Sequence, residues 1–480
     1  MHTQAIAALL AAALAIGQAA WSQAATPPNF LIALADDCTY WDMGCYGGQA
    51  ATPHMDKLCG EGLRMNRCFQ AAPMCSPTRH CLYTGIYPVR SGAWPNHTRV
   101  YNGVRSVAHH LGEAGYRVAL SGKKHIGPPA SFPFEFSVGE ATSGANPDFA
   151  AVDKLMDECS QSGTPMALFL CSNEPHGPYT KGDPSKYPPE ELKLPPFWVD
   201  TPTTRRQYSK YLAEITYYDS QVGQALELLE KHGLADNTVV IVLSEQGNGF
   251  PFAKWTCYEQ GLASGMIVRW PGVVQPGTQS NALVEYVDVA PTMLDIAGVR
   301  EVTVGGGLDG GLDGQSFVPV LKGETSTHKQ HVFGLQTSRG IINGPESYGI
   351  RSVRSDRYRY VRNLTPDAEF SNAAMKKREW REWNARAAAG DEHAAALVNR
   401  YVRRPAEELF DCEADPHCMT NLADDPTLAS IKAELSAKLD DWMRQQGDEG
   451  QATEMRAKER QGGREKKEKK KNKKRRQQTA

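Results

Sequence analysis

Four short apolar runs constrain the fold of this chain more than any other feature. They cover residues 29–34, 116–121, 166–171 and 238–243, and apolar residues follow one another in them rather than alternating with polar ones. This pattern is typical of strands that are buried on both faces, as in a parallel sheet. Segments with helical periodicity lie between the runs. The sequence therefore predicts an α/β fold with a large, mostly parallel sheet sandwiched by helices.

Three helices are predicted between and beside these strands, over residues 56–62, 104–115 and 207–232. The longest carries an apolar stripe with the spacing of one buried helix face. The stripe consists of Leu212, Ile215, Val222, Leu226 and Leu229. Gly233 follows directly and is a plausible C-terminal cap for this helix.

The character of the chain changes after about residue 341. A Gly-Leu-Asp-Gly repeat at 304–314 indicates a flexible connection, and residues 348–361 then alternate as antiparallel strands do. Residues 428–446 have the pattern of a terminal amphipathic helix. We therefore predict a catalytic domain over 27–344 and a smaller C-terminal α+β subdomain with an antiparallel sheet over 345–447.

The N-terminus has the pattern of an export signal. An apolar run at 5–20 is followed by Ser22-Gln23-Ala24, which places small residues at a cleavage site. The run is too short for a membrane span, and no later segment reaches that length. The sequence predicts a signal peptide over 1–24, cleavage near Ala24, and a secreted or periplasmic protein without a transmembrane anchor. A short N-terminal helix that stays attached is the alternative.

The formal net charge of −2 hides a strong asymmetry. From Arg456 to Arg476 there are 13 Lys and Arg against 3 Glu, a net of +10, so the rest of the chain carries −12. We predict a basic, disordered tail over 448–480. It is either a solvated tail or a tether to an anionic surface or polysaccharide. No nucleic-acid partner is expected, and the oligomeric state stays open.

The chain contains eleven cysteines and no CxxC pair that would indicate zinc. Export would permit disulfides. An odd total leaves at least one cysteine unpaired. Cys412 and Cys418 form the most plausible local bridge, and the other pairings stay open.

Polar and charged residues follow each of the four apolar runs. Asp36-Asp37 follow the first, Lys123 and His125 the second, His176 the third and Glu245-Gln246 the fourth. Any of these alone has an ordinary interpretation, such as a turn, a cap or a surface loop. Open α/β sheets, however, bind ligands outside the carboxyl ends of their strands. The four endings together therefore predict one functional site.

Cys75-Ser76-Pro77-Thr78-Arg79, continued by Leu82, Thr84 and Gly85, resembles the signature of type I, formylglycine-dependent sulfatases of the alkaline-phosphatase-like superfamily. Tyr83 departs from the residues usual at its position. Further segments match the family's motifs. They are Asn29 to Gly47, Gly122-Lys123-Lys124-His125-Ile126-Gly127, Glu174-Pro175-His176-Gly177-Pro178, Lys254 to Gly261, and Glu408-Leu409-Phe410-Asp411 with Asn421-Leu422.

The resemblance implies that a maturation enzyme converts Cys75 to formylglycine (3-oxoalanine), the nucleophile. It also implies one divalent cation, and its ligands would be Asp36, Asp37, Cys75, Glu245 and Gln246. Oxygen ligands favour Ca²⁺ over zinc. Glu245-Gln246 departs from the family's usual Ser-Asp-His or Ser-Asp-Asn and resembles a bacterial subgroup with Ser-Glu-Gln-Gly.

The remaining implied roles concern charge and protons. Arg79 would orient the residue-75 diol, and Lys123 and Lys254 would hold sulfate oxygens. His125 is the candidate base and His176 the candidate acid. Proline at 77 favours the first position of a helix over roughly 77–84, with an N-terminus that attracts anions. His97 either touches substrate or is an ordinary loop residue, and the loop interpretation is preferred.

The predicted function is hydrolysis of a sulfate ester or sulfamate on a carbohydrate, such as a sulfated polysaccharide or glycosaminoglycan. One alternative is an enzyme specific for N-sulfoglucosamine, a sulfamidase. Another is a phosphoester or phosphonate hydrolase on the same scaffold, which normally carries more His and Asp ligands for two metals. A catalytically silent glycan-binding protein is disfavoured by the intact set of candidate catalytic residues.

Overall fold

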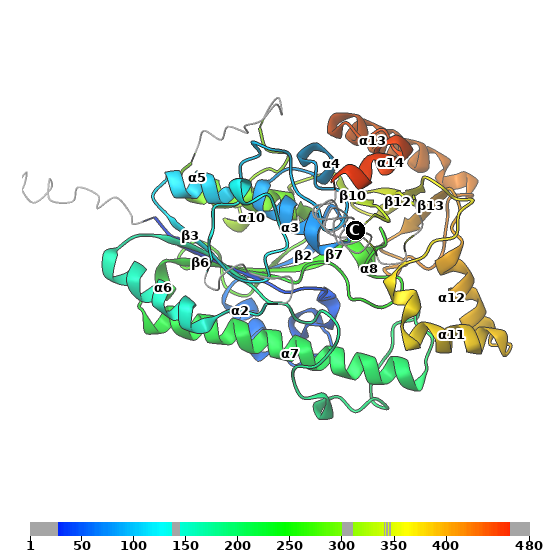
Figure 1. Ribbon diagram of the computed structural model, residues 1–480, viewed down its shortest axis with the longest axis horizontal. Helices are drawn as coiled ribbons and strands as arrows, with labels where there is room; N and C mark the ends of the chain where they lie inside the picture. Colours follow the sequence, from blue (N-terminus) through cyan, green and yellow to red (C-terminus); the bar gives the residue numbers. More distant parts are fainter. Residues whose placement is uncertain are drawn as a thin grey trace, which may run out of the picture.

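The computed structural model describes residues 27–136, 145–299, 311–339, 341, 344 and 347–460. The predicted signal peptide and residues 304–310 of the predicted connection lie outside these residues. The described chain contains two sheets, flanked by helices (Figure 1). No helix within the described ranges is long and apolar enough to cross a membrane.

The larger sheet is mixed but mostly parallel, with the order β4-β3-β5-β1-β6-β7-β2-β8 and with β9 paired to β2. Among the described strands of this sheet, only β7 runs antiparallel to its neighbours. The predicted fold class is confirmed. The strands are β1 (Asn29–Leu34), β2 (Leu63–Phe69), β3 (Arg117–Gly122), β4 (Glu135–Phe136), β5 (Met166–Cys171), β6 (Thr238–Leu243), β7 (Ala263–Arg269), β8 (Thr278–Ser280) and β9 (Val284–Glu285).

The four strands predicted from the apolar runs are adjacent and parallel, in the order β3-β5-β1-β6. Their carboxyl ends are level, because Leu34 lies opposite both Cys171 and Leu243, and Gly122 lies opposite Cys171. The polar residues that follow these strands therefore meet at one edge of the sheet, where a ligand site is expected.

Helices cover both faces of the larger sheet (Figure 1). Side chains of β1 alternate between the two layers: Leu31 and Ala33 pack in one apolar cluster, and Ile32 and Leu34 in the other. The first layer holds α2 (Pro53–Glu61), α6 (Phe149–Ser162) and α7 (Pro202–Lys231); the second holds α3 (Cys75–Thr84), α5 (Val107–Glu113), α9 (Val289–Ile296) and α10 (Val318–Leu321).

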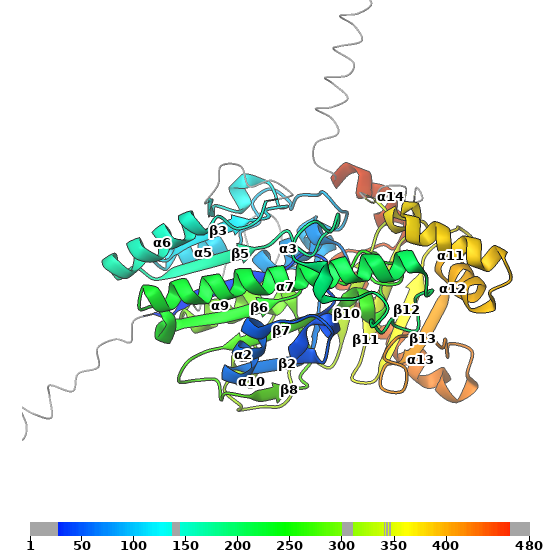
Figure 2. The same cartoon turned by 90° about the horizontal axis from the view of Figure 1, so that it is seen from below.

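Helix α7 is the longest and joins the two parts of the molecule. It runs under the larger sheet and reaches α11 (Arg378–Ala388), as Figure 2 shows. At that end the buried Trp383 indole donates to the Thr204 hydroxyl at 3.0 Å. The predicted stripe faces inward, with Leu212, Ile215, Val222 and Leu229 buried. The second part is therefore fixed to the same helix that supports the sheet.

The smaller sheet is antiparallel, with the order β10-β11-β12-β13. Its strands are β10 (Val332–Gln336), β11 (Ile350–Arg354), β12 (Tyr358–Asn363) and β13 (Glu407–Asp411). Helices α12 (Glu392–Val402) and α13 (Ala429–Gln446) also belong to this part. The predicted boundary at 345 is too late, because β10 pairs with β11 and so belongs to the second sheet.

The predicted disordered tail is wrong over residues 448–460. A final helix, α14 (Gln451–Arg460), packs on the second part through the buried Arg351, which pairs with Asp448 and Glu454. Arg460 then donates to the carbonyl of Gly92 at 2.8 Å. These buried ion pairs hold residues 448–460 against the second part. The composition of the segment, which is rich in charged residues, does not reveal this contact. Residues 461–480 lie outside the described part.

All eleven cysteines are free thiols, so the predicted bridge between Cys412 and Cys418 is not formed. The two thiols nevertheless interact, and this contact together with burial raises the pKa of Cys412.

Candidate functional site

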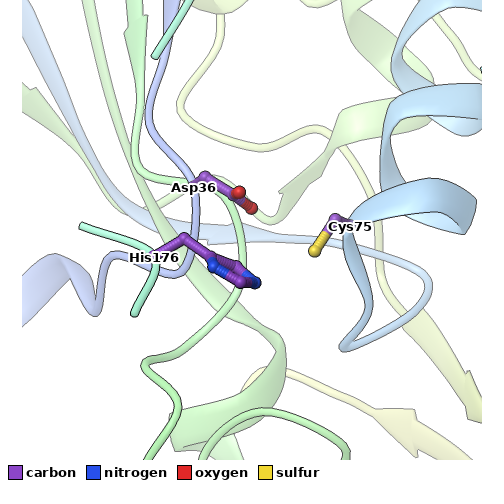
Figure 3. Close-up of side chains that lie close together, drawn as sticks. All are labelled: Asp36, Cys75 and His176. Carbon is purple, nitrogen blue, oxygen red and sulfur yellow. The ribbon is translucent and has the colours of Figure 1, made fainter. Parts of the chain in front are cut away.

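A cavity of about 830 Å³ lies at the carboxyl edge of the four central strands. Six residues predicted for the site line it: Asp37, Cys75, Lys123, His125, His176 and Lys254. Figure 3 shows the side chains of Asp36, Cys75 and His176 converging on the same space from different segments. The structure thus brings together groups that are up to 217 residues apart in the chain.

Cys75 is the first residue of α3, which begins two residues before the predicted start. Its side chain is buried, and its sulfur lies 3.3 Å from the Lys254 ammonium and 3.8 Å from Asp37 Oδ1. Burial raises the pKa of the thiol to about 12, although Lys254 opposes this. Reactive cysteines have a lowered pKa. The unmodified Cys75 thiol is therefore a poor nucleophile in this environment.

Ligand atoms of Asp36, Asp37, Cys75 and Glu245 all lie within 4.8 Å of one another, and all four residues are buried. The buried carboxylates of Asp36 and Glu245 are met by ion pairs with Lys123 and Arg79, whereas Gln246 Oε1 is buried without a hydrogen-bond donor among the described residues. So much buried negative charge requires a compensating cation or ion pairs. The donor set is rich in oxygen and fits a hard divalent cation.

Gln246 lies at this cluster through its amide. Its Nε2 is 2.5 Å from Asp37 Oδ1 and 3.4 Å from Cys75 Sγ. Oxygen and nitrogen of a glutamine amide are assigned from their hydrogen-bond partners. Rotation of the amide would turn Oε1 toward the same point, so Gln246 fits either as a donor to Asp37 or as a cation ligand.

Two lysines and one arginine balance the acids. Lys254 Nζ lies 2.5 and 2.7 Å from the two Asp37 oxygens, and Lys123 pairs with Asp36. Although burial disfavours charge, Asp37 raises the pKa of Lys254. Burial lowers the pKa of Lys123 to about 7, and Glu245 opposes this shift. Both lysines line the cavity, and each is paired there with a buried acid.

Arg79 is fully buried in α3. It pairs with Glu245 at 2.8 Å and donates to the backbone carbonyls of Lys123 and Ala35. These contacts connect the ends of β1, β3 and β6. No hydrogen bond joins Arg79 to Cys75 among the described residues. Its contacts therefore fix Glu245, whereas the sequence predicted that it would orient residue 75.

The two candidate acid–base histidines both have a lowered pKa. Burial and the neighbouring Lys123 lower the pKa of His125 well below its ordinary value. Asp37 favours protonation of His176, but burial, Lys254 and Lys123 outweigh it and lower the pKa of His176 to about 4. An anion bound between the lysines would raise both values, because it favours the protonated ring.

His97 also belongs to the site, contrary to the preferred loop interpretation. It lines the cavity, and its Nδ1 lies 2.8 Å from His125 Nε2. The sequence offered only a histidine in the stretch Trp94 to His97, which is a weak signal because the contact forms across the fold. Sequence reasoning likewise missed Tyr179 and Lys377 on the cavity wall.

The backbone is strained around this cavity. Asp37, His97, His125, Glu245 and Trp255 have φ between 46° and 67° although none is a glycine. Left-handed backbone at such residues is uncommon and clusters at functional sites. These are five of the seven such residues in the described part of the chain. The fold therefore holds these side chains in orientations that ordinary loops would not adopt.

We expect His97→Phe to lower kcat about tenfold to a hundredfold, because His125 loses the hydrogen bond that fixes its ring. KM should change less than about threefold, since the lysine–anion contacts remain. His97→Asn keeps a hydrogen-bonding atom near Nδ1 and tolerates the left-handed backbone, so it should restore much of kcat. Equal losses in both variants, in steady-state assays, would contradict a positioning role.

Comparison with protein families identifies the class of the protein. The sulfatase family model matches residues 28–299, more than half of the chain, and the model of the N-sulphoglucosamine sulphohydrolase C-terminal region matches 247–377. The chain therefore belongs to the sulfatase family and is a sulfuric ester hydrolase.

Two curated relatives cover most of the chain. An ulvan-active sulfatase from Formosa agariphila is 31% identical over 88% of this chain and 81% of its own length. The human N-sulphoglucosamine sulphohydrolase is 28% identical over 87% of this chain and 90% of its own length.

Solved structures share the fold. A protein in complex with its substrate D-glucosamine-2-N,6-O-disulfate has a TM-score of 0.66 at 19% identity, over 89% of this chain and 99% of that one. A phosphonate monoester hydrolase from Silicibacter pomeroyi has a TM-score of 0.65 at 18% identity, over 88% and 96%. At these identities the two structures support the fold and no particular reaction.

Proposed function

We propose that the protein hydrolyses a sulfate ester or sulfamate on a carbohydrate, using a formylglycine formed from Cys75 and one bound divalent cation. The observation that carries this proposal is the placement of residue 75. It lies buried at the start of α3, between the acidic cluster and the Lys254 ammonium, and faces the cavity.

The nucleophile would be the hydrated aldehyde of residue 75. A maturation enzyme oxidises the cysteine side chain to formylglycine, whose hydrate is a geminal diol. One hydroxyl would supply the attack on sulfur, and the second would allow sulfate to leave as the aldehyde re-forms. The raised pKa of Cys75 supports this assignment, because the thiol itself would stay protonated at neutral pH.

Asp36, Asp37, Glu245 and Gln246 would hold the cation together with residue 75. When bound, a hard cation such as Ca²⁺ would polarise the nucleophile and a sulfate oxygen. We propose Ca²⁺ rather than zinc because these four residues offer oxygen donors and none of them is a histidine or cysteine.

Lys123 and Lys254 would bind the remaining sulfate oxygens and stabilise charge in the transition state. His125 is neutral and can accept a proton from the residue-75 diol. His176 would protonate the leaving group after the bound anion has raised its pKa from about 4. Arg79 would keep Glu245 in place rather than touch the substrate.

A sulfated polysaccharide or glycosaminoglycan is the proposed substrate class, supported by the ulvan-active relative. A sulfamate on glucosamine is the second candidate, favoured by the match of residues 247–377 to the sulphohydrolase C-terminal model. Secretion or export to the periplasm would place the enzyme with such polymers. The phosphonate alternative has weaker support, since the acidic cluster fits a single cation.

The deciding experiment is a panel of defined saccharides that carry O-sulfate, N-sulfate or phosphate, assayed for release of the inorganic anion. Peptide mass spectrometry must first show formylglycine at residue 75. We expect sulfate release from at least one sulfated saccharide and release of phosphate at least about a thousandfold slower. With residue 75 converted, absence of sulfate release from every saccharide would overturn the carbohydrate assignment.

A further inference from the structure

One wall of the cavity comes from the second part of the chain. It includes Lys377, which lies between η7 (Ala373–Lys376) and α11. The Lys377 ammonium donates to the carbonyl of Gly249 at 2.9 Å, in the loop that follows β6. It also lies 5.9 Å from the ring centre of Tyr179 and 5.8 Å from that of Phe250. Lys377 thus reaches the loop that carries Glu245 and Gln246.

The charge of Lys377 is largely uncompensated. Within the described part of the chain its ammonium forms one hydrogen bond, to a neutral carbonyl, and no ion pair. An ammonium has three donors, so two are left for another partner. Glu379 is the nearby acid of this wall, yet it forms no salt bridge with Lys377 in the described chain. Burial lowers the pKa of Lys377, while Glu379 and Asp37 oppose this shift.

The Lys377 ammonium lies near the acidic cluster but makes no direct contact with its residues in the described chain. A Cβ placed on Gly249 would lie 3.2 Å from Lys377 Nζ and 4.0 Å from Asp37 Oδ2. Asp37 in turn contacts Lys254 and Cys75. Lys377 therefore lies on the cavity wall near the acidic cluster, where a sugar would lie if its sulfate were at Cys75, and Tyr179 lines the same wall.

We propose that Lys377 binds a second anionic group of the substrate, either a carboxylate or a further sulfate, on the sugar that carries the scissile sulfate or on its neighbour. This inference rests on the proposed function and narrows its substrate class to saccharides with at least two anionic groups. Two exposed cations, Lys210 and Arg378, line the same cavity and extend the positive surface toward the solvent.

The test compares the same sugar with and without its second charge. The probes are monosulfated glucosamine, the corresponding disulfate, and a disaccharide that links the monosulfated glucosamine to a uronate. Binding is measured by calorimetry in the Cys75→Ala background, which lacks the nucleophile. Lys377→Met removes the ammonium and keeps an unbranched side chain, Lys377→Arg keeps the charge, and Lys376→Met is the exposed control.

Lys377→Met should weaken binding of the disulfate or the uronate disaccharide about tenfold to a hundredfold, the size of one charge-assisted hydrogen bond. Binding of monosulfated glucosamine should change less than about threefold, and Lys377→Arg should keep most of the discrimination. Weaker binding of the disulfate would identify the second group as a sulfate, and weaker binding of the uronate disaccharide would identify it as a carboxylate. Equal weakening of all three probes, or of none, would overturn the inference.

The two proposals fail differently. If no saccharide releases sulfate in the panel while Lys377→Met still weakens binding selectively, the anionic subsite stands and the hydrolytic assignment does not. If sulfate is released from monosulfated and disulfated sugars with the same kcat/KM in wild type and Lys377→Met, the hydrolytic assignment stands and the subsite does not.

Discussion

Cys75→Ser should abolish steady-state turnover, with kcat lower than that of the wild type by more than about a thousandfold. A serine hydroxyl at the start of α3 would still face the cavity beside Lys254. It can attack sulfur, but it has no second hydroxyl with which to expel sulfate. The expected result is therefore a protein that carries a stable sulfate ester at residue 75 after incubation with substrate, detected by intact-protein mass spectrometry.

Two variants serve as controls for this result. Cys75→Ala should lose turnover equally and gain no mass, because it has no oxygen to sulfate. Cys59→Ser changes a partly exposed cysteine in α2 and should keep wild-type kcat. Undiminished multiple turnover by Cys75→Ser would show that formylglycine is not required and would contradict the nucleophile assignment.

The sequence predicted the centre of the fold well, because buried parallel strands give uninterrupted apolar runs. The bounds of β1, β5 and β6 agree with the predicted ones, and β3 differs by one residue. The helix at Cys75 begins earlier than expected, because the chain turns into α3 directly after Met74. The local sequence pattern was enough to predict these strands, because each is buried between neighbouring strands and helices along its whole length.

Tertiary contacts account for what the sequence did not reveal. β10 is assigned to the second sheet only by its pairing with β11. The composition of residues 448–460 is that of a solvated tail. Only the structure shows that Asp448 and Glu454 both pair with the buried Arg351. His97 and Lys377 reach the cavity from distant segments, and no periodicity marks such an approach. The strand ends located the predicted site residues because sheet topology alone brings them together.

Asp37→Asn should have the second large effect, lowering kcat/KM at least about a thousandfold and removing the bound cation. Asp37 contacts three other residues of the site: its carboxylate pairs with Lys254, accepts from Gln246 and lies 3.6 Å from His176 Nε2. Although burial disfavours its charge, Lys254 keeps the pKa of Asp37 below its ordinary value. A neutral amide at residue 37 would leave the Lys254 ammonium without its carboxylate partner. It would also remove one negative charge from the acidic cluster.

The measurement has to separate loss of the cation from loss of the fold. Metal content of the purified variant should fall well below one ion per chain by elemental mass spectrometry, while circular dichroism shows the wild-type spectrum. Asp183→Asn changes an exposed carboxylate that accepts from Ser185 and from no other residue of the described chain, and it should retain both metal and activity. Removal of divalent ions from the wild type with a chelator should abolish turnover, and added Ca²⁺ should restore it. Because the proposed cation and Lys254 would share one carboxylate, Asp37→Asn should stay inactive when Ca²⁺ is added in excess. Full recovery would mean that Asp37 only tunes the affinity for the cation.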